Sequence, residues 1–86
     1  FFACLSVQPP HDPYVAPAEY MSRYNPAQLS LRPNVPRVAR MEAQARRDLA
    51  GYYAMIENWD DNIGRIRAAL SEAGMAFRTH LMVFSD

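Results

Sequence analysis

A long amphipathic stretch between residues 37 and 73 limits what this chain of 86 residues can fold into. Apolar residues recur in it at alternating steps of three and four, the spacing that places side chains on one face of an α-helix; they are Leu49, Tyr52, Ile56, Trp59, Ile63, Ile66 and Leu70. The stretch contains no proline, and Gly74 follows it where a left-handed residue commonly ends a helix. The sequence therefore predicts a helix over residues 37–73, whose opposite, solvated face carries Arg46, Asp48, Glu57, Asp61, Arg65 and Glu72.

The length of this helix conflicts with the size of a compact domain. At about 1.5 Å per residue it would extend for roughly 55 Å, which is more than a compact chain of this length normally spans. We therefore expect the helix to bend or break, either before Asp48 or near Gly51.

Composition excludes several classes of function. Nine Lys and Arg residues balance nine Asp and Glu residues, so the net charge of zero indicates no surface for nucleic acid or for anionic membranes. The single cysteine, Cys4, cannot form an internal disulfide and is expected to pack as a small hydrophobic residue. No apolar stretch reaches the roughly 18 residues that a membrane span needs.

Two short apolar runs, at residues 1–7 and 80–85, are typical of strands that are buried on both faces. The chain opens inside the first run without Met and stops directly after the second. We interpret residues 1–86 as an internal piece of a larger domain, truncated at both ends. Strands of this kind would leave a contiguous apolar surface exposed if no further strands or helices covered them.

The segment between the first run and the long helix is rich in proline. All seven prolines lie between Pro9 and Pro36, which excludes a long helix or a continuous sheet there. A short helix is predicted over residues 18–24, opening at Pro17. Two strands joined by this loop segment and the long helix predict an α/β fold with a parallel strand pair and a right-handed crossover.

This topology predicts a site. Parallel strands present their C-terminal ends at one edge of a sheet, and ligands bind beside that edge in open α/β folds. His11 follows the first strand between flanking prolines, and Asp86 ends the second. We therefore expect His11 and Asp86 to share a crevice, with His11 as a rigidly presented site residue and Asp86 as a metal or catalytic ligand. An exposed loop imidazole at His11 and a turn-forming carboxylate at Asp86 are the structural alternatives.

Three stretches together resemble the sulfatase family. The first joins an apolar strand to Pro-His-x-Pro, the second has the form YYA-x-I-x-x-x-D-x-x-I-G-x-I within a helix, and the third leads from a strand to Ser-Asp. In this chain they read FFACLSVQPPHDPY, ARRDLAGYYAMIENWDDNIGRIRAALSEAG and THLMVFSD. They occur in the family's order and extend over nearly the whole chain.

The resemblance implies an alkaline-phosphatase-like α/β sandwich that hydrolyses sulfate esters with a bound divalent cation, usually calcium. His11 matches the family histidine that contacts the sulfate and assists the leaving group, and Asp86 matches an aspartate that ligates the metal. The substrate it implies is a small sulfate ester or a sulfated glycan. Periplasmic, extracellular or lysosomal locations are usual for the family.

The chain also departs from the family pattern. The Cys/Ser-x-Pro-Ser-Arg signature, whose first residue becomes formylglycine, does not occur, and Cys4 lies instead in Ala-Cys-Leu-Ser-Val. The N-terminal metal aspartates and the residue that follows Asp86 in the family are missing as well. We expect these residues to be part of a sulfatase and inactive alone. The alternatives are a phosphodiesterase or phosphonate monoester hydrolase of the same superfamily, or a non-catalytic helical interaction module.

Overall fold

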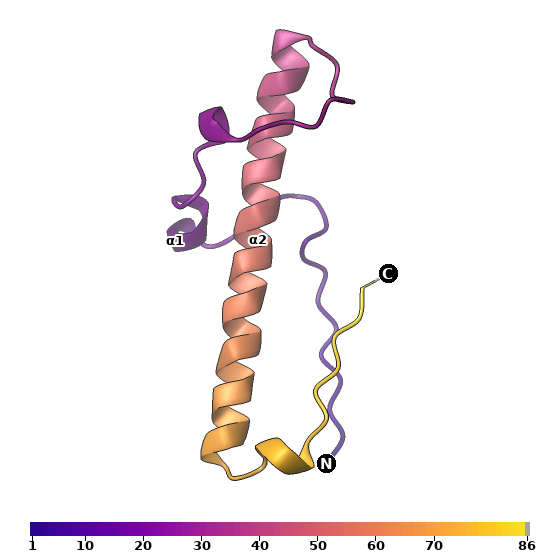
Figure 1. Cartoon of the computed structure of the whole chain (residues 1–86), viewed down its shortest axis with the longest axis vertical. Helices are drawn as coiled ribbons and strands as arrows, with labels where there is room; N and C mark the ends of the chain where they lie inside the picture. Colours follow the sequence, from indigo (N-terminus) through magenta and orange to yellow (C-terminus); the bar gives the residue numbers. More distant parts are fainter. Residues whose placement is uncertain (86) are drawn as a thin grey trace.

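One long helix forms the axis of the molecule, and the other segments lie along it (Figure 1). The structure is a computed structural model that describes residues 1–85. Its helical elements are α1 (Ala18–Met21), the 3-10 turn η1 (Pro26–Gln28), α2 (Ala39–Glu72) and the 3-10 turn η2 (Ala76–Arg78). The overall dimensions are 53 × 26 × 20 Å, so the molecule is elongated along α2.

Helix α2 confirms the predicted long helix, with bounds that differ by two residues at the start and one at the end. Gly74 ends it with a positive φ of 66°. The Gly74 amide donates to the carbonyl of Ser71 at 2.9 Å, and the Met75 amide donates to that of Leu70 at 2.8 Å. These two bonds form a Schellman motif, which satisfies carbonyl groups that the helix leaves free at its C-terminus.

The predicted bend or break near Asp48 or Gly51 is wrong, because α2 continues through both positions as a single helix of 34 residues. The prediction assumed that the rest of the chain would enclose the helix within a compact domain. Instead the other segments run along the sides of the helix (Figure 1), and the molecule is elongated. The helix can therefore extend without a bend.

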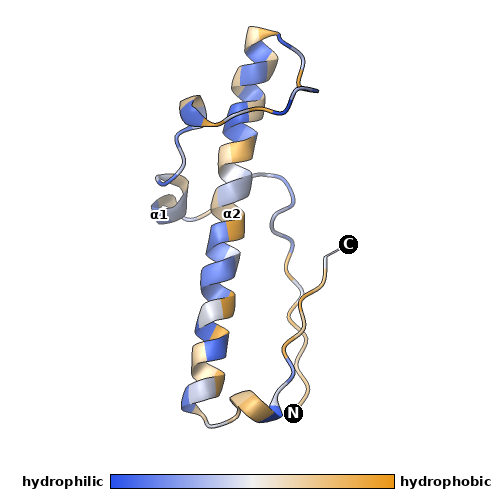
Figure 2. Cartoon of the chain, in the orientation of Figure 1, coloured by the Kyte–Doolittle hydropathy of each residue, from blue (hydrophilic) through white to orange (hydrophobic). Residues whose placement is uncertain are grey.

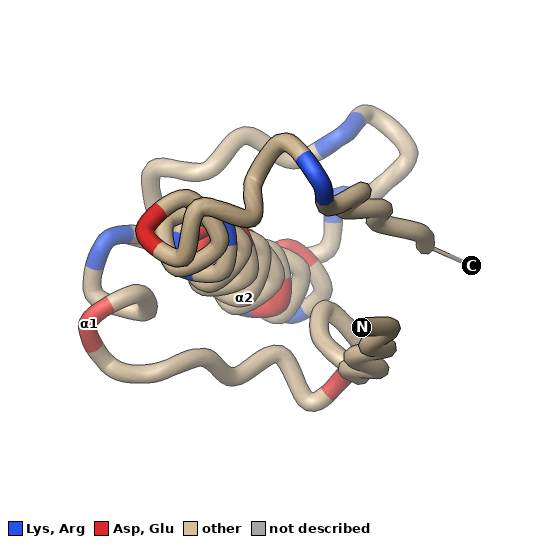
Figure 3. Tube along the Cα trace, turned by 90° about the horizontal axis from the view of Figure 1, so that it is seen from below, with Lys and Arg blue, Asp and Glu red and all other residues tan. Residues whose placement is uncertain are grey.

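The predicted α/β fold is also wrong. No residue between 1 and 85 is in a β-strand, so the strands expected at residues 1–7 and 80–85, their parallel pairing and the crossover are all contradicted. Both segments are extended and run in the same direction beside α2 (Figure 1), but they lie apart when the molecule is seen along the helix (Figure 3). A strand forms only where a neighbouring backbone accepts and donates its hydrogen bonds.

These two segments are largely apolar (Figure 2), and most of their apolar side chains are exposed. Phe2 is 93% exposed and Phe84 is 84% exposed, and Phe1, Leu5, Met82 and Val83 are also exposed. Apolar side chains are therefore exposed, but they lie on two separate extended segments rather than on strands.

The core lies between α1 and the middle of α2. Its buried side chains are Tyr20, Ala50, Ala54 and Met55, joined by the buried backbone of Gly51. The larger apolar residues of the predicted helix face contribute less, since Ile56 is 42% exposed. Small residues on α2 let the proline-rich segment lie close to the helix. The face of α2 that this segment covers is the face that is buried.

Helix α1 is shorter than the predicted helix over residues 18–24, because it ends at Met21. It opens after Pro17, as expected, and the amides of Tyr20 and Met21 both donate to the Pro17 carbonyl. None of the helices in the described part of the chain is both long enough and apolar enough to cross a membrane.

Candidate functional site

His11 lies in an exposed turn of the proline-rich segment. Its amide donates to the carbonyl of Gln8 at 3.0 Å, which closes the turn. Its Nδ1 atom lies 2.8 Å from the backbone oxygen of Asp12 and 2.8 Å from the Asp12 carboxylate. A proton on Nδ1 that is donated to these oxygens fixes the tautomer and leaves Nε2 for another partner. The imidazole is therefore oriented by its neighbour and accessible to solvent, with 75% of its side chain exposed.

The chain that follows His11 is held against α2. The ring of Tyr14 meets that of Tyr52 edge to face, with ring centroids 6.1 Å apart. The backbone of Tyr14 also packs against Gly51 in the middle of the helix. The turn that carries His11 is thus anchored a short distance along the chain.

A polar cluster fastens the end of α1 to α2. Arg23 forms an ion pair with Glu57 at 2.5 Å, and its guanidinium lies 4.6 Å from the centroid of the Tyr20 ring. Within the described residues, Oε2 of Glu57 is buried and has no hydrogen-bond partner. Tyr24 stacks at an angle on Tyr53, with centroids 5.8 Å apart. The guanidinium of Arg23 therefore lies between an anion and an aromatic ring, and it joins Glu57 of α2 to Tyr20 of α1.

The cluster shifts the pKa values of three of its members. A hydrogen bond to the Asp61 carboxylate is the largest cause that raises the pKa of Tyr20, and burial adds to it. Burial is the largest cause for Tyr24, and the Glu57 carboxylate raises its pKa further. The hydrogen bond to Glu57 raises the pKa of Arg23. Both tyrosines are therefore held in the neutral form.

These shifts predict a loss of stability at high pH. Because folding raises the pKa of Tyr20 above its ordinary value of 10.0, its contribution to stability is complete below pH 10 and is lost as the pH rises through the folded-state pKa. We expect the free energy of unfolding, measured by urea denaturation, to fall above pH 10. The fall should be smaller in Tyr20→Phe and Tyr24→Phe. An unchanged fall in both variants would contradict the assignment.

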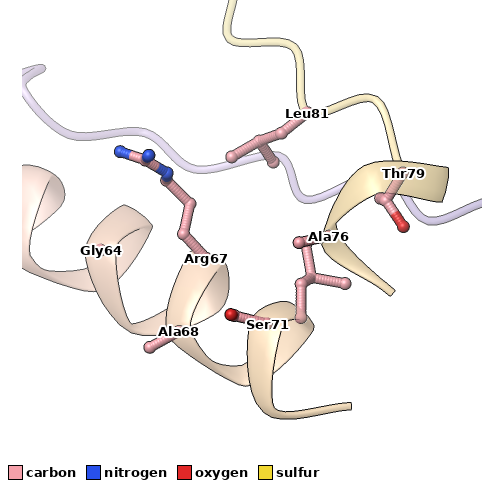
Figure 4. A pocket seen from close by; sticks show the side chains of 8 residues that line it. Gly64, Arg67, Ala68, Ser71, Ala76, Thr79 and Leu81 are labelled. Atoms are coloured by element: carbon pink, nitrogen blue, oxygen red, sulfur yellow. The ribbon is translucent and has the colours of Figure 1, made fainter. Parts of the chain in front are cut away.

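Two open cavities of about 490 Å³ each lie along α2. The first lies between the C-terminal half of α2 and the segment after it, where Leu81 faces the helix and Arg67 extends beside it (Figure 4). The second lies beside the proline-rich segment and is lined by Tyr14, Val15, Met21, Tyr24, Pro26, Gln44, Arg47, Asp48 and Ala50. His11 lines neither of these two cavities.

The predicted partner of His11 cannot be placed, because Asp86 lies outside the described residues. Whether the two side chains share a crevice therefore stays a prediction. Among residues 1–85, no three His, Cys, Asp or Glu side chains gather closely enough to hold a metal ion. Calcium takes six to eight oxygen ligands. The described residues thus do not fit a complete calcium site.

The sequence did not identify the residues that hold the site region together. It assigned Glu57 to the solvated face of the helix and predicted a bend or break near Gly51. The structure places Glu57 in the ion pair with Arg23, and Gly51 against Tyr14. A glycine inside a strong helical pattern, which costs about 1 kcal/mol relative to alanine, was the signal of a close approach.

The chain belongs to the sulfatase family, whose pattern it matches over residues 1–86. It is 36% identical over 87 aligned residues to an ulvan-active sulfatase of Formosa agariphila. The match covers the whole chain but spans only 17% of the length of that relative. No solved structure matches the chain. The sulfatase resemblance found in the three sequence stretches is thus confirmed.

Proposed function

We propose that these residues form part of the catalytic domain of a sulfatase, which hydrolyses the sulfate esters of small molecules or glycans. The observation that carries the proposal is the family match along the whole chain. The ulvan-active relative makes a sulfated glycan the first substrate class to test.

In this proposal His11 contacts the sulfate group and assists the leaving group. Its Nδ1 is occupied by Asp12, so Nε2 is the atom that faces the substrate. A protonated ring can donate its Nε2 proton to the ester oxygen as the S–O bond breaks, which is general acid catalysis.

The rest of the machinery comes from other residues of the enzyme. Asp86 is proposed as one ligand of a divalent cation, usually calcium in this family, which would stabilise charge on the sulfate oxygens when bound. The nucleophile is proposed to be a hydroxyl group of a hydrated formylglycine, made from a Cys or Ser outside these 86 residues. The chain by itself should therefore neither hydrolyse sulfate esters nor bind calcium tightly.

A segment exchange tests this proposal. The matching residues of the Formosa agariphila sulfatase are replaced by this chain, and release of sulfate from an aryl sulfate and from ulvan is measured. We expect the exchanged enzyme to remain active and the separate 86-residue chain to be inactive. A folded but inactive exchanged enzyme would contradict the proposal, as would sulfate release or micromolar calcium binding by the separate chain.

A further inference from the structure

Gly51 is a buried glycine in the interior of α2, where glycine costs about 1 kcal/mol relative to alanine. A Cβ atom added there would collide with the backbone oxygen of Tyr14 and would lie 2.9 Å from both its carbonyl carbon and its Cβ. Backbone atoms cannot move aside as the end of a flexible side chain can. The absence of a side chain at Gly51 is therefore what allows Tyr14 to lie on the helix.

The contact is close to His11 along the chain. Tyr14 follows His11 by three residues, a distance of at most about 10 Å for extended backbone. Pro13 lies between them and fixes one backbone dihedral, and the Val15 amide donates to the Pro13 carbonyl at 2.8 Å. A shift of Tyr14 away from the helix therefore moves the turn that carries His11.

We infer that Gly51 is a positioning residue for His11. It allows the backbone of Tyr14 to pack directly on α2 and so determines where the imidazole of His11 lies relative to the helix. The contact between the rings of Tyr14 and Tyr52 also holds Tyr14 at this position on α2. The catalytic part of this inference rests on the proposed function, but the structural part can be measured without any activity.

The chain offers a matched control in Gly64, which lies in the same helix but has no atom within 4 Å of an added Cβ. It also contains only two histidines, His11 and His80, so a histidine-labelled sample gives two sets of side-chain signals. We expect Gly51→Ala to shift the NMR signals of His11 and to leave those of His80 in place. Gly64→Ala should shift neither.

A second variant protects this test against misfolding. Tyr52→Ala removes the ring contact without any collision, and it should also shift the His11 signals. Circular dichroism reports whether α2 persists. If His11 signals match those of the unaltered chain in every variant that keeps its helix, the inference is overturned. If Gly51→Ala fails to fold, Tyr52→Ala decides the outcome.

A double-mutant cycle in the exchanged sulfatase links the position to the reaction. We expect Gly51→Ala to lower kcat about tenfold or more and Gly64→Ala to change it less than twofold, since misplacing a catalytic group by about 1 Å can slow a reaction 100-fold. In a His11→Ala background, Gly51→Ala should have almost no further effect. An equal loss in both backgrounds would show that Gly51 supports the fold generally. No loss from His11→Ala alone would instead refute the proposed function while the NMR result stands.

Discussion

Replacing His11 by alanine in the exchanged sulfatase is expected to lower kcat/KM by about 10²–10⁴, the usual contribution of a positioned general acid. The structure motivates this because the imidazole is exposed and its Nδ1 is held by Asp12. The loss should depend on the leaving group. An alkyl sulfate needs a proton on its departing oxygen more than a nitrophenyl sulfate does, so the alkyl ester should show the larger loss.

The control for this prediction is His80→Ala, which removes the other, exposed histidine of the chain. It should leave both substrates within about twofold of the unaltered rate, in line with the small effect of most surface substitutions. Equal losses from the two histidine variants, or a His11→Ala loss that is the same for alkyl and nitrophenyl esters, would contradict a general-acid role for His11.

Shortening Met55 to alanine is expected to lower the free energy of unfolding of the chain by about 2–5 kcal/mol, the range found for buried Met→Ala changes. Met55 is only 4% exposed and belongs to a core with few buried side chains. Little surrounding structure can fill the space that it leaves. A loss of this size is a large part of the stability of a small domain, so much of the population should unfold.

Met41→Ala is the matched control, because it makes the same change in the same helix where the side chain is 47% exposed. Its effect should stay below about 1 kcal/mol, and alanine has a slightly higher helix propensity. Urea denaturation followed by Trp59 fluorescence measures both variants. Similar losses for Met41→Ala and Met55→Ala would show that the buried face of α2 has been placed wrongly.

The helix could be predicted because its signals are local. Its apolar period, the lack of proline and Gly74 all act within a few residues, and the structure confirms the helix and its end. Its bend was predicted from an assumed compact shape and does not occur. The prediction of two strands is wrong for a different reason. An extended apolar segment becomes a strand only beside another strand, and residues 1–85 supply none.

The candidate site was predictable only in part. The exposed turn at His11 follows from its prolines, which act locally. Its attachment to α2 does not, because the contacts of Tyr14 with Gly51 and of Arg23 with Glu57 join residues more than 30 positions apart. The spacing of apolar residues pointed to Ile56 and Ile66, whereas Ala50 and Ala54 are buried. The proline-rich segment packs closely on α2, and small residues allow this where large ones would not.

The contacts that fasten the proline-rich segment fall on α2 between Arg46 and Asp61. Substitutions in this part of the helix should therefore be tolerated less well than substitutions after it. Beyond that zone Arg65, Ile66 and Ala68 are exposed, and Gly64 has open space around it. A library that randomises the helix after Asp61 would sample surface chemistry with little disturbance to the turn at His11. The same effort spent around Gly51 would mostly yield chains in which that turn is no longer held against α2.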